Sequence, residues 1–296
     1  MNASNTLADN GHVSEVVLRF SCNDQPGIVA AVANAFALQG FNIRESSQFE
    51  DPHTGKFFMR TVLSSCQGEK SLAQVRSVFQ PLAQRFDMDW QLHDYQYKPK
   101  VVIAVSKWGH CLEHLLNSWK RGVLPIDIVA VVSNHQDMAS LCQWYGVPYH
   151  YLPVTKDTKA EQEQQILALM QELAADFLVL ARYMQILSDN LCQQLKGKAI
   201  NIHHSFLPGF KGAKPYHQAH QRGVKLIGAT AHYVTPDLDE GPIIEQAVER
   251  VTHANTPDAL VEIGRDVERV VLYRAVLWHA QHRVLLNEDK TVVFNR

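Results

Sequence analysis

The first hundred residues alternate between short apolar runs and amphipathic segments. Residues 16–21 (VVLRFS) form a mostly apolar run with β-branched residues, which is typical of a buried strand. The alanine-rich run 28–38 predicts a packed helix, and Gly40 offers a C-terminal stop because glycine tolerates the left-handed conformation. We expect the remaining elements to be strands at 41–48 and 57–63, a helix at 71–86 and a strand at 87–95. This order predicts the split βαβ arrangement, an α+β sheet with helices on one face.

A polar segment, residues 94–100 (DYQYKPK), separates this region from a different pattern. Beyond it, fully apolar strands alternate with helices, which predicts a doubly wound, mostly parallel α/β sheet. The expected strands are 101–106, 126–133, 177–181 and 199–203, and the expected helices are 111–120, 138–145 and 161–174. We therefore divide the chain into a ferredoxin-like domain at 1–95 (ordered from about residue 14), a linker at 96–100 and a larger domain at 101–296.

Composition and charge limit the partners and the cellular compartment that we expect for the chain. The formal net charge of −2 gives no reason to expect a nucleic-acid partner, and no apolar run is long enough to span a membrane. Residues 1–12 are polar and lack the apolar core of a secretion signal. The five cysteines are widely spaced and form no C-x-x-C pair, which indicates reduced thiols in a cytoplasmic protein.

Polar side chains gather in three segments, at residues 181–187, 201–208 and 230–242, and ligands of open α/β sheets bind beyond the carboxyl ends of strands. Asn201 and His203 are two residues apart, so a strand places both side chains on one side. An amide and an imidazole that converge can hold a developing oxyanion, and Asp239 can deprotonate a water beside them. Taken singly, each residue also fits a structural role, since Asn and Asp form loops and histidine often satisfies backbone groups.

The motifs Asn201-Ile202-His203 and 232–242 (HYVTPDLDEGP) resemble those of the formyltransferase-type folate domain over about residues 100–251. The resemblance implies that Asn201, His203 and Asp239 are catalytic and that His204 and His232 support them. It also implies two loops that bind the pterin of the folate, although core packing explains their apolar members almost as well. These loops comprise Arg182, Tyr183, Met184, Gln185, Ile186 and Leu187, and Val234, Thr235, Pro236, Asp237 and Leu238.

Departures from that pattern indicate which members of the family the chain resembles. Transformylases of phosphorylated amines hold the phosphate in a glycine-rich loop after the first strand, whereas residues 106–111 here read SKWGHC, with Trp108 in the place of the phosphate. His204 replaces the usual proline, and residues 264–269 (GRDVER), together with the C-terminal 291–294 (TVVF), are similar to the tail of formyltetrahydrofolate deformylases. Residues 24–28 (DQPGI) and 40–43 (GFNI) resemble the ACT domain that those deformylases carry.

The whole-chain resemblance implies metal-independent hydrolysis of 10-formyltetrahydrofolate to formate and tetrahydrofolate. This reaction supplies formate, balances the one-carbon folate pool and is connected through that pool with purine biosynthesis. The ACT resemblance implies an amino-acid effector and a homo-oligomer; a dimerisation module without a ligand is the alternative. The residues expected at the effector are Asp24, Gln25, Gly27, Ile28, Asn42 and Ile43.

Three other functions remain open at this point. A folate-dependent formyltransferase acting on an unphosphorylated amine would need an acceptor to turn over. A zinc hydrolase would draw its ligands from His203, His204, His217 and His220, but the chain lacks the H-E-x-x-H motif. A non-catalytic amino-acid sensor would leave Asn201, His203 and Asp239 without a purpose.

Overall fold

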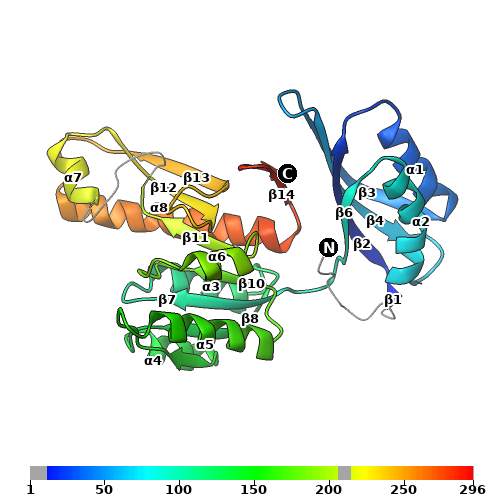
Figure 1. Cartoon of the computed structure of the whole chain (residues 1–296). Helices are drawn as coiled ribbons and strands as arrows, with labels where there is room; N and C mark the ends of the chain where they lie inside the picture. Colours follow the sequence, from blue (N-terminus) through cyan, green and yellow to red (C-terminus); the bar gives the residue numbers. More distant parts are fainter. Residues whose placement is uncertain (1–11, 206–214, 296) are drawn as a thin grey trace. The chain divides into compact units, whose positions relative to one another are not determined.

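The computed structural model describes residues 12–205 and 215–295 and contains two compact units (Figure 1). One unit extends through Tyr97 and the other begins at Lys98, inside the linker expected from the sequence. The expectation for residues 1–12 falls almost wholly outside the described residues, and so do residues 206–208 of the second polar segment.

The N-terminal unit is the predicted split βαβ fold. Its strand order is β3-β4-β2-β6, with antiparallel pairing throughout, and a short β1–β5 pair lies beside it. Three phenylalanines join the sheet to its helices, with ring centroids 5.6 Å apart for Phe20 and Phe79 and 6.1 Å apart for Phe36 and Phe79. The elements are β1 His12–Val13, β2 Glu15–Asn23, α1 Ile28–Leu38, β3 Phe41–Asp51, β4 Lys56–Ser65, β5 Lys70–Ser71, α2 Leu72–Arg85 and β6 Asp89–Asp94.

The C-terminal end of the chain returns to this unit. Residues 281–285, and those from Val292 onward, pack with the N-terminal unit, so the larger domain expected at 101–296 does not keep its whole C-terminal end. The reason lies in β4, which is buried on both faces: Phe58, on the face away from the helices, packs against Leu285 and Phe294. On the same side, Arg60 Nε donates to the carbonyl oxygen of Gln281 at 3.2 Å.

The second unit is the predicted doubly wound sheet, with strand order β13-β12-β11-β10-β7-β8-β9. Pairing is parallel from β11 to β9, and β12 and β13 add to one edge in antiparallel fashion. The elements are β7 Lys100–Val105, α3 His110–Lys120, β8 Asp127–Ser133, α4 Ala139–Tyr145, β9 Tyr149–Tyr151, α5 Lys159–Glu172, β10 Phe177–Leu180, α6 Asp189–Gln194, β11 Ala199–His203, α7 Pro215–Gln221, β12 Leu226–Tyr233, β13 Ile243–Arg250 and α8 Pro257–Ala280. β14 Val284–Asn287 and β15 Lys290–Val293 pair with each other, and each belongs partly to the N-terminal unit and partly to this one.

Helices cover both faces of this sheet. Apolar residues of β7, β8 and β10 pack against α5 and α6 on one side, in a cluster that includes Ile166, Met170 and Leu191. On the other side α8 runs along β11, β12 and β13 and contacts α3 (Figure 1). The sequence pattern predicted no helix at 257–280, and it also left β9, α6, α7, β12, β13, β14 and β15 unassigned. No helix of the described residues has the length and hydropathy needed to cross a membrane.

Candidate functional site

Antiparallel pairing of β11 with β12 brings together residues that are 27 to 31 positions apart in the chain. The register sets Asn201 opposite His232 and His203 opposite Thr230. Asn201 Nδ2 lies 3.3 Å from His232 Nε2, and Asp239 Oδ2 lies 3.1 Å from His203 Nδ1. The structure thus brings Asn201, His203 and Asp239 to one place, with His232 between Asn201 and Asp239.

The two imidazoles have different hydrogen-bonding states. His232 Nδ1 lies 2.9 Å from the carbonyl oxygen of Tyr233, which can only accept, so Nδ1 donates there, and His232 Nε2 faces both Asn201 Nδ2 at 3.3 Å and Asp239 Oδ1 at 3.6 Å. His203 turns Nδ1 toward Asp239, which leaves its buried Nε2 without a hydrogen-bond partner among the described residues. A buried imidazole nitrogen without a partner is available to a substrate.

Asp239 is held in its position by a tight loop between β12 and β13. Its backbone is left-handed, with φ of 58°, a conformation that aspartate tolerates better than most residues. A Cβ at Gly241 would lie 1.8 Å from the carbonyl oxygen of Tyr233, so only glycine lets the loop close on β12. Burial raises the pKa of Asp239, but hydrogen bonds and charges of His203 and His232 outweigh burial and hold the pKa well below its usual value. The carboxylate is therefore ionised.

His204 is the second imidazole at the end of β11. Its ring lies 4.9 Å from that of His203, centroid to centroid. Burial, together with the charges of Arg182 and His203, lowers the pKa of His204 to about 4. His204 is therefore neutral near pH 7, whatever its role.

The two loops expected to bind the pterin divide into buried and exposed members. Tyr183 and Leu187 are 6% and 8% exposed and pack in the core beside α5, so the core-packing explanation accounts for both side chains. Met184, Ile186 and Leu238 are instead 53%, 61% and 55% exposed. Of the remaining members, Arg182 is 12% exposed in its side chain, Gln185, Val234 and Thr235 are half-buried, and Pro236 and Asp237 are exposed.

The first of these loops is anchored from both sides. Tyr183 Oη donates to Gln162 Oε1 at 3.0 Å, and the backbone N–H of Met184 donates to Ser106 Oγ at 3.0 Å. At its end, the N–H of Ser188 donates to the buried carboxylate of Glu163 at 2.8 Å. A fixed backbone with protruding apolar side chains suits a flat, apolar ligand surface.

Beside the site lies a buried carboxylate that the sequence reading missed. Glu268 of α8 accepts from His110 Nε2 at 2.7 Å and Tyr216 Oη at 2.8 Å, and faces Arg182 Nε at 3.5 Å. A Cβ at Gly264 would lie 2.1 Å from Tyr216 Oη, so glycine admits the tyrosine. The signal that could have found Glu268 is a charge on the apolar stripe of a helix, a position where charges are rarely left unpaired.

Potential metal ligands converge elsewhere than the zinc alternative expected. In the described part of the chain, one trio of such ligand atoms lies within 4.8 Å, from His110, Cys111 and Glu268. His217 and His220 are exposed on α7 and do not join His203 and His204 in such a group. The Glu268 oxygens already accept two hydrogen bonds, and His110 donates through the nitrogen that a metal would need. These donors fit an internal hydrogen-bond cluster better than a metal site.

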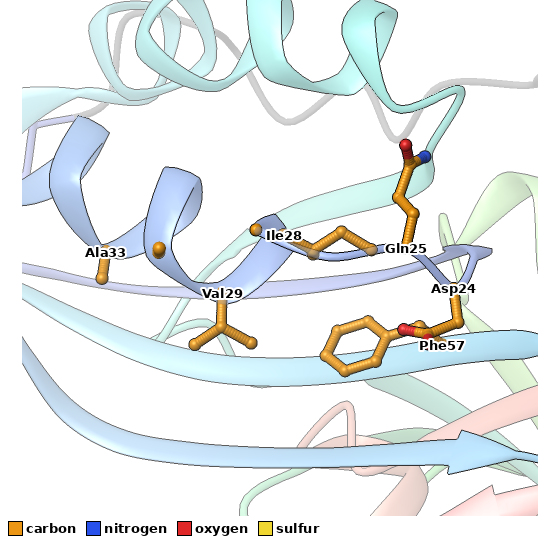
Figure 2. A pocket seen from close by; sticks show the side chains of 8 residues that line it. Asp24, Gln25, Ile28, Val29, Ala33 and Phe57 are labelled. Carbon is orange, nitrogen blue, oxygen red and sulfur yellow. The ribbon is translucent and has the colours of Figure 1, made fainter.

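The N-terminal unit carries a pocket of its own at the start of α1, with a volume of about 460 Å³ (Figure 2). It is lined by Asp24, Gln25, Gly27, Ile28, Val29, Ala30, Ala33 and Phe57. Four of the residues expected at an effector site line it, whereas Asn42 and Ile43 of β3 do not. Figure 2 shows Val29 and Ala33 on one side of α1, near the ring of Phe57 on the neighbouring strand.

Comparisons with known proteins agree with both units. The formyl transferase family model matches residues 99–276, and the ACT domain model matches residues 16–80. A formyltetrahydrofolate deformylase of Corynebacterium sp. (strain P-1) is 50% identical over 277 residues, which are 94% of this chain and 97% of that relative.

Solved structures give the same result. The crystal structure of formyltetrahydrofolate deformylase from Burkholderia mallei has a TM-score of 0.91 and 51% identity, covering 95% of this chain and 99% of the other. A phosphoribosylglycinamide formyltransferase from Anaplasma phagocytophilum matches with a TM-score of 0.61 and 30% identity, covering 67% and 95%. With a 50% identical relative matched over nearly all of both chains, this chain belongs to the formyltetrahydrofolate deformylase family.

Proposed function

We propose that this chain hydrolyses 10-formyltetrahydrofolate to formate and tetrahydrofolate in the cytoplasm, without a metal ion, and so adjusts the one-carbon folate pool that purine biosynthesis draws on. The observation that carries the proposal is the contact of Asp239 with His203, 3.1 Å apart, beside a buried His203 Nε2 without a partner among the described residues. This arrangement offers a proton acceptor and a polar nitrogen to one small substrate group.

The reaction follows from these groups. The formyl group on the folate is an amide, so addition of water to its carbon produces a tetrahedral oxyanion. Asn201 Nδ2 and protonated His203 hydrogen-bond this oxygen, which stabilises the transition state more than the ground state. Asp239 orients the water and takes its proton. His203 then passes a proton to the departing folate nitrogen as the carbon–nitrogen bond breaks.

The folate rests on the exposed apolar side chains of the two loops. Met184, Ile186 and Leu238 are large, apolar and more than half exposed. Val234 of the second loop packs against the same core cluster as Tyr183 and Leu187 of the first. We assign the pteridine ring to this surface, where burial of apolar area contributes about 25 cal/mol per Å².

The direct test measures formate released by the purified chain from 10-formyltetrahydrofolate alone, with and without EDTA. We expect one formate for each tetrahydrofolate, at the same rate in both samples. Turnover that requires an added amine would identify a formyltransferase instead. A rate that EDTA abolishes and Zn²⁺ restores would contradict metal independence.

The pocket at the start of α1 is our candidate for an amino-acid effector site, in a chain that assembles into an oligomer. We expect one amino acid of a panel to raise the Tm and to change the rate of formate release, since a ligand at about 100 times its Kd stabilises by about 2.7 kcal/mol. Ala33→Phe fills the pocket and should abolish both responses. Ala37→Phe, on an exposed position of the same helix, should keep them.

A response that survives in Ala33→Phe would place the effector elsewhere. No response to any amino acid, with an oligomer found by light scattering, would favour the dimerisation module without a ligand.

A further inference from the structure

Hydrolysis and formyl transfer differ in the nucleophile that reaches the formyl carbon. The second unit shares its fold with a protein named phosphoribosylglycinamide formyltransferase, so the fold alone does not decide between water and an amine. Some feature beside Asn201, His203 and Asp239 must keep larger nucleophiles away.

The buried Glu268 cluster (His110, Arg182, Tyr216 and Glu268) includes a residue at the β10 edge of β11, on the other side of that strand from Asp239. Parallel pairing of β10 with β11 sets Leu180 beside Asn201 at the carboxyl end of β10, and Arg182 follows two residues later in the loop, where its charge acts on His204. Its carbonyl oxygen accepts from the N–H of Ser106, which ties it to the end of β7. Asp239 reaches the site from the β12 edge of β11, and Arg182 stands at the opposite, β10 edge.

The guanidinium of Arg182 makes an ion pair with Glu268 there, without a hydrogen bond at Nε among the described residues. Glu268 is 1% exposed, and its carboxylate faces Arg182 Nε at 3.5 Å while accepting from His110 and Tyr216. Burial raises the pKa of Glu268, but the hydrogen bond from His110 and the charge of Arg182 outweigh burial and lower it. The carboxylate is thus ionised and attracts the guanidinium of Arg182, whose charge also acts on His204.

The backbone conformation of Arg182 indicates that its side chain has a function at the site. Its φ of 64° is left-handed, a conformation that glycine adopts freely and that is strained for other L-residues. A strained residue of this kind at a site, with a buried and paired side chain, points to a function for that side chain.

We propose that Arg182, positioned by Glu268, closes the β10 side of the formyl site to nucleophiles larger than water and so determines that the enzyme is a hydrolase. The inference rests on the proposed function. Without this side chain, a neutral amine adds to the formyl carbon in place of water. The amine nitrogen loses a proton to Asp239, the bond to the folate nitrogen breaks, and that nitrogen takes a proton from His203, which yields a formamide and tetrahydrofolate.

The test uses the full chain, 10-formyltetrahydrofolate labelled with ¹³C in the formyl group, and glycinamide as a small amine probe. Mass spectrometry gives the ratio of formylglycinamide to formate, corrected for the reaction without enzyme. The wild type should release formate almost alone. Arg182→Gly should raise the ratio about 10- to 200-fold, the range that one steric change in a pocket provides.

Two further variants sharpen the result. Arg182→Lys, which keeps bulk and charge, should stay near the wild-type ratio, and Glu268→Gln, which frees the arginine, should lie between wild type and Arg182→Gly. Arg274→Ala removes an exposed guanidinium from α8, where it pairs with Glu245, and should leave the ratio and the rate unchanged. The ratio does not depend on the folded fraction, so a merely structural role for Arg182 would not move it.

The outcomes separate the two proposals. A wild type that releases no formate overturns the proposed function, whatever the variants do. A wild type that releases formate, with an unchanged ratio in Arg182→Gly, overturns only the inference about Arg182. If Arg182→Gly does not fold, an unchanged ratio in Glu268→Gln overturns it instead.

Discussion

Replacing Asp239 with asparagine is expected to lower kcat for formate release by about 10²- to 10⁴-fold, the contribution of a general base, with a much smaller change in KM. Asparagine keeps the size of the side chain and can still accept from His203 Nδ1, but it cannot take a proton from water. Initial rates of formate release at several folate concentrations give kcat and KM separately.

The pH profile of the wild type adds an independent check. Burial raises the pKa of Asp239, yet its contacts with His203 and His232 hold the pKa below the usual range, so Asp239 stays ionised throughout mildly acidic conditions. The acid limb of kcat should therefore not come from Asp239. Glu240→Gln changes the exposed neighbouring carboxylate and should leave kcat near the wild-type value. A kcat in Asp239→Asn within a few-fold of wild type would exclude Asp239 as the base.

Replacing Asn201 with alanine is expected to lower kcat by about 10²- to 10³-fold, the cost of removing one oxyanion donor. The amide lies 3.3 Å from His232 Nε2, so its position is set before substrate binds. The loss should fall on kcat more than on KM, because the donor meets full negative charge only in the transition state.

Two controls make the Asn201 result interpretable. Asn190→Ala removes an exposed amide from α6, where Gln194 Nε2 donates to it at 3.3 Å, and should keep full activity. Circular dichroism and thermal unfolding should show that Asn201→Ala is folded. Near-normal turnover in a folded Asn201→Ala would remove Asn201 from the mechanism.

Local patterns in the sequence were enough to predict most elements of the N-terminal unit and the parallel strands β7, β8, β10 and β11 of the second unit, with the helices α3, α4 and α5. Apolar runs of β-branched residues at 16–21 and 126–133 lie in strands β2 and β8, because a buried strand needs apolar side chains. Helix α1 occupies 28–38, the range expected from its apolar pattern and the glycine at its end. Helix α8 was not predicted, because only its packing against β11, β12 and β13 shows which of its faces is buried.

The candidate site divides in the same way. The spacing of Asn201 and His203 placed two polar side chains on one side of a strand, and the structure brings Asp239 to them through the loop after β12. The exposure of Met184 and Ile186, and the burial of Tyr183 and Leu187, did not follow from the sequence. All four are apolar or aromatic, and burial depends on which of them meets α5.

By itself, the sequence determined the two folds and the pair of motifs that carries Asn201, His203 and Asp239, because each depends on residues close together in the chain. Only the tertiary structure decided that Glu268 of α8 holds Arg182 beside the site and that residues 281–285 return to cover β4. Both depend on residues that are distant in sequence. A buried charge needs an oppositely charged or hydrogen-bonding partner, and an apolar sheet face needs other apolar residues to cover it. Neither requirement specifies which segment of the chain provides the partner or the cover.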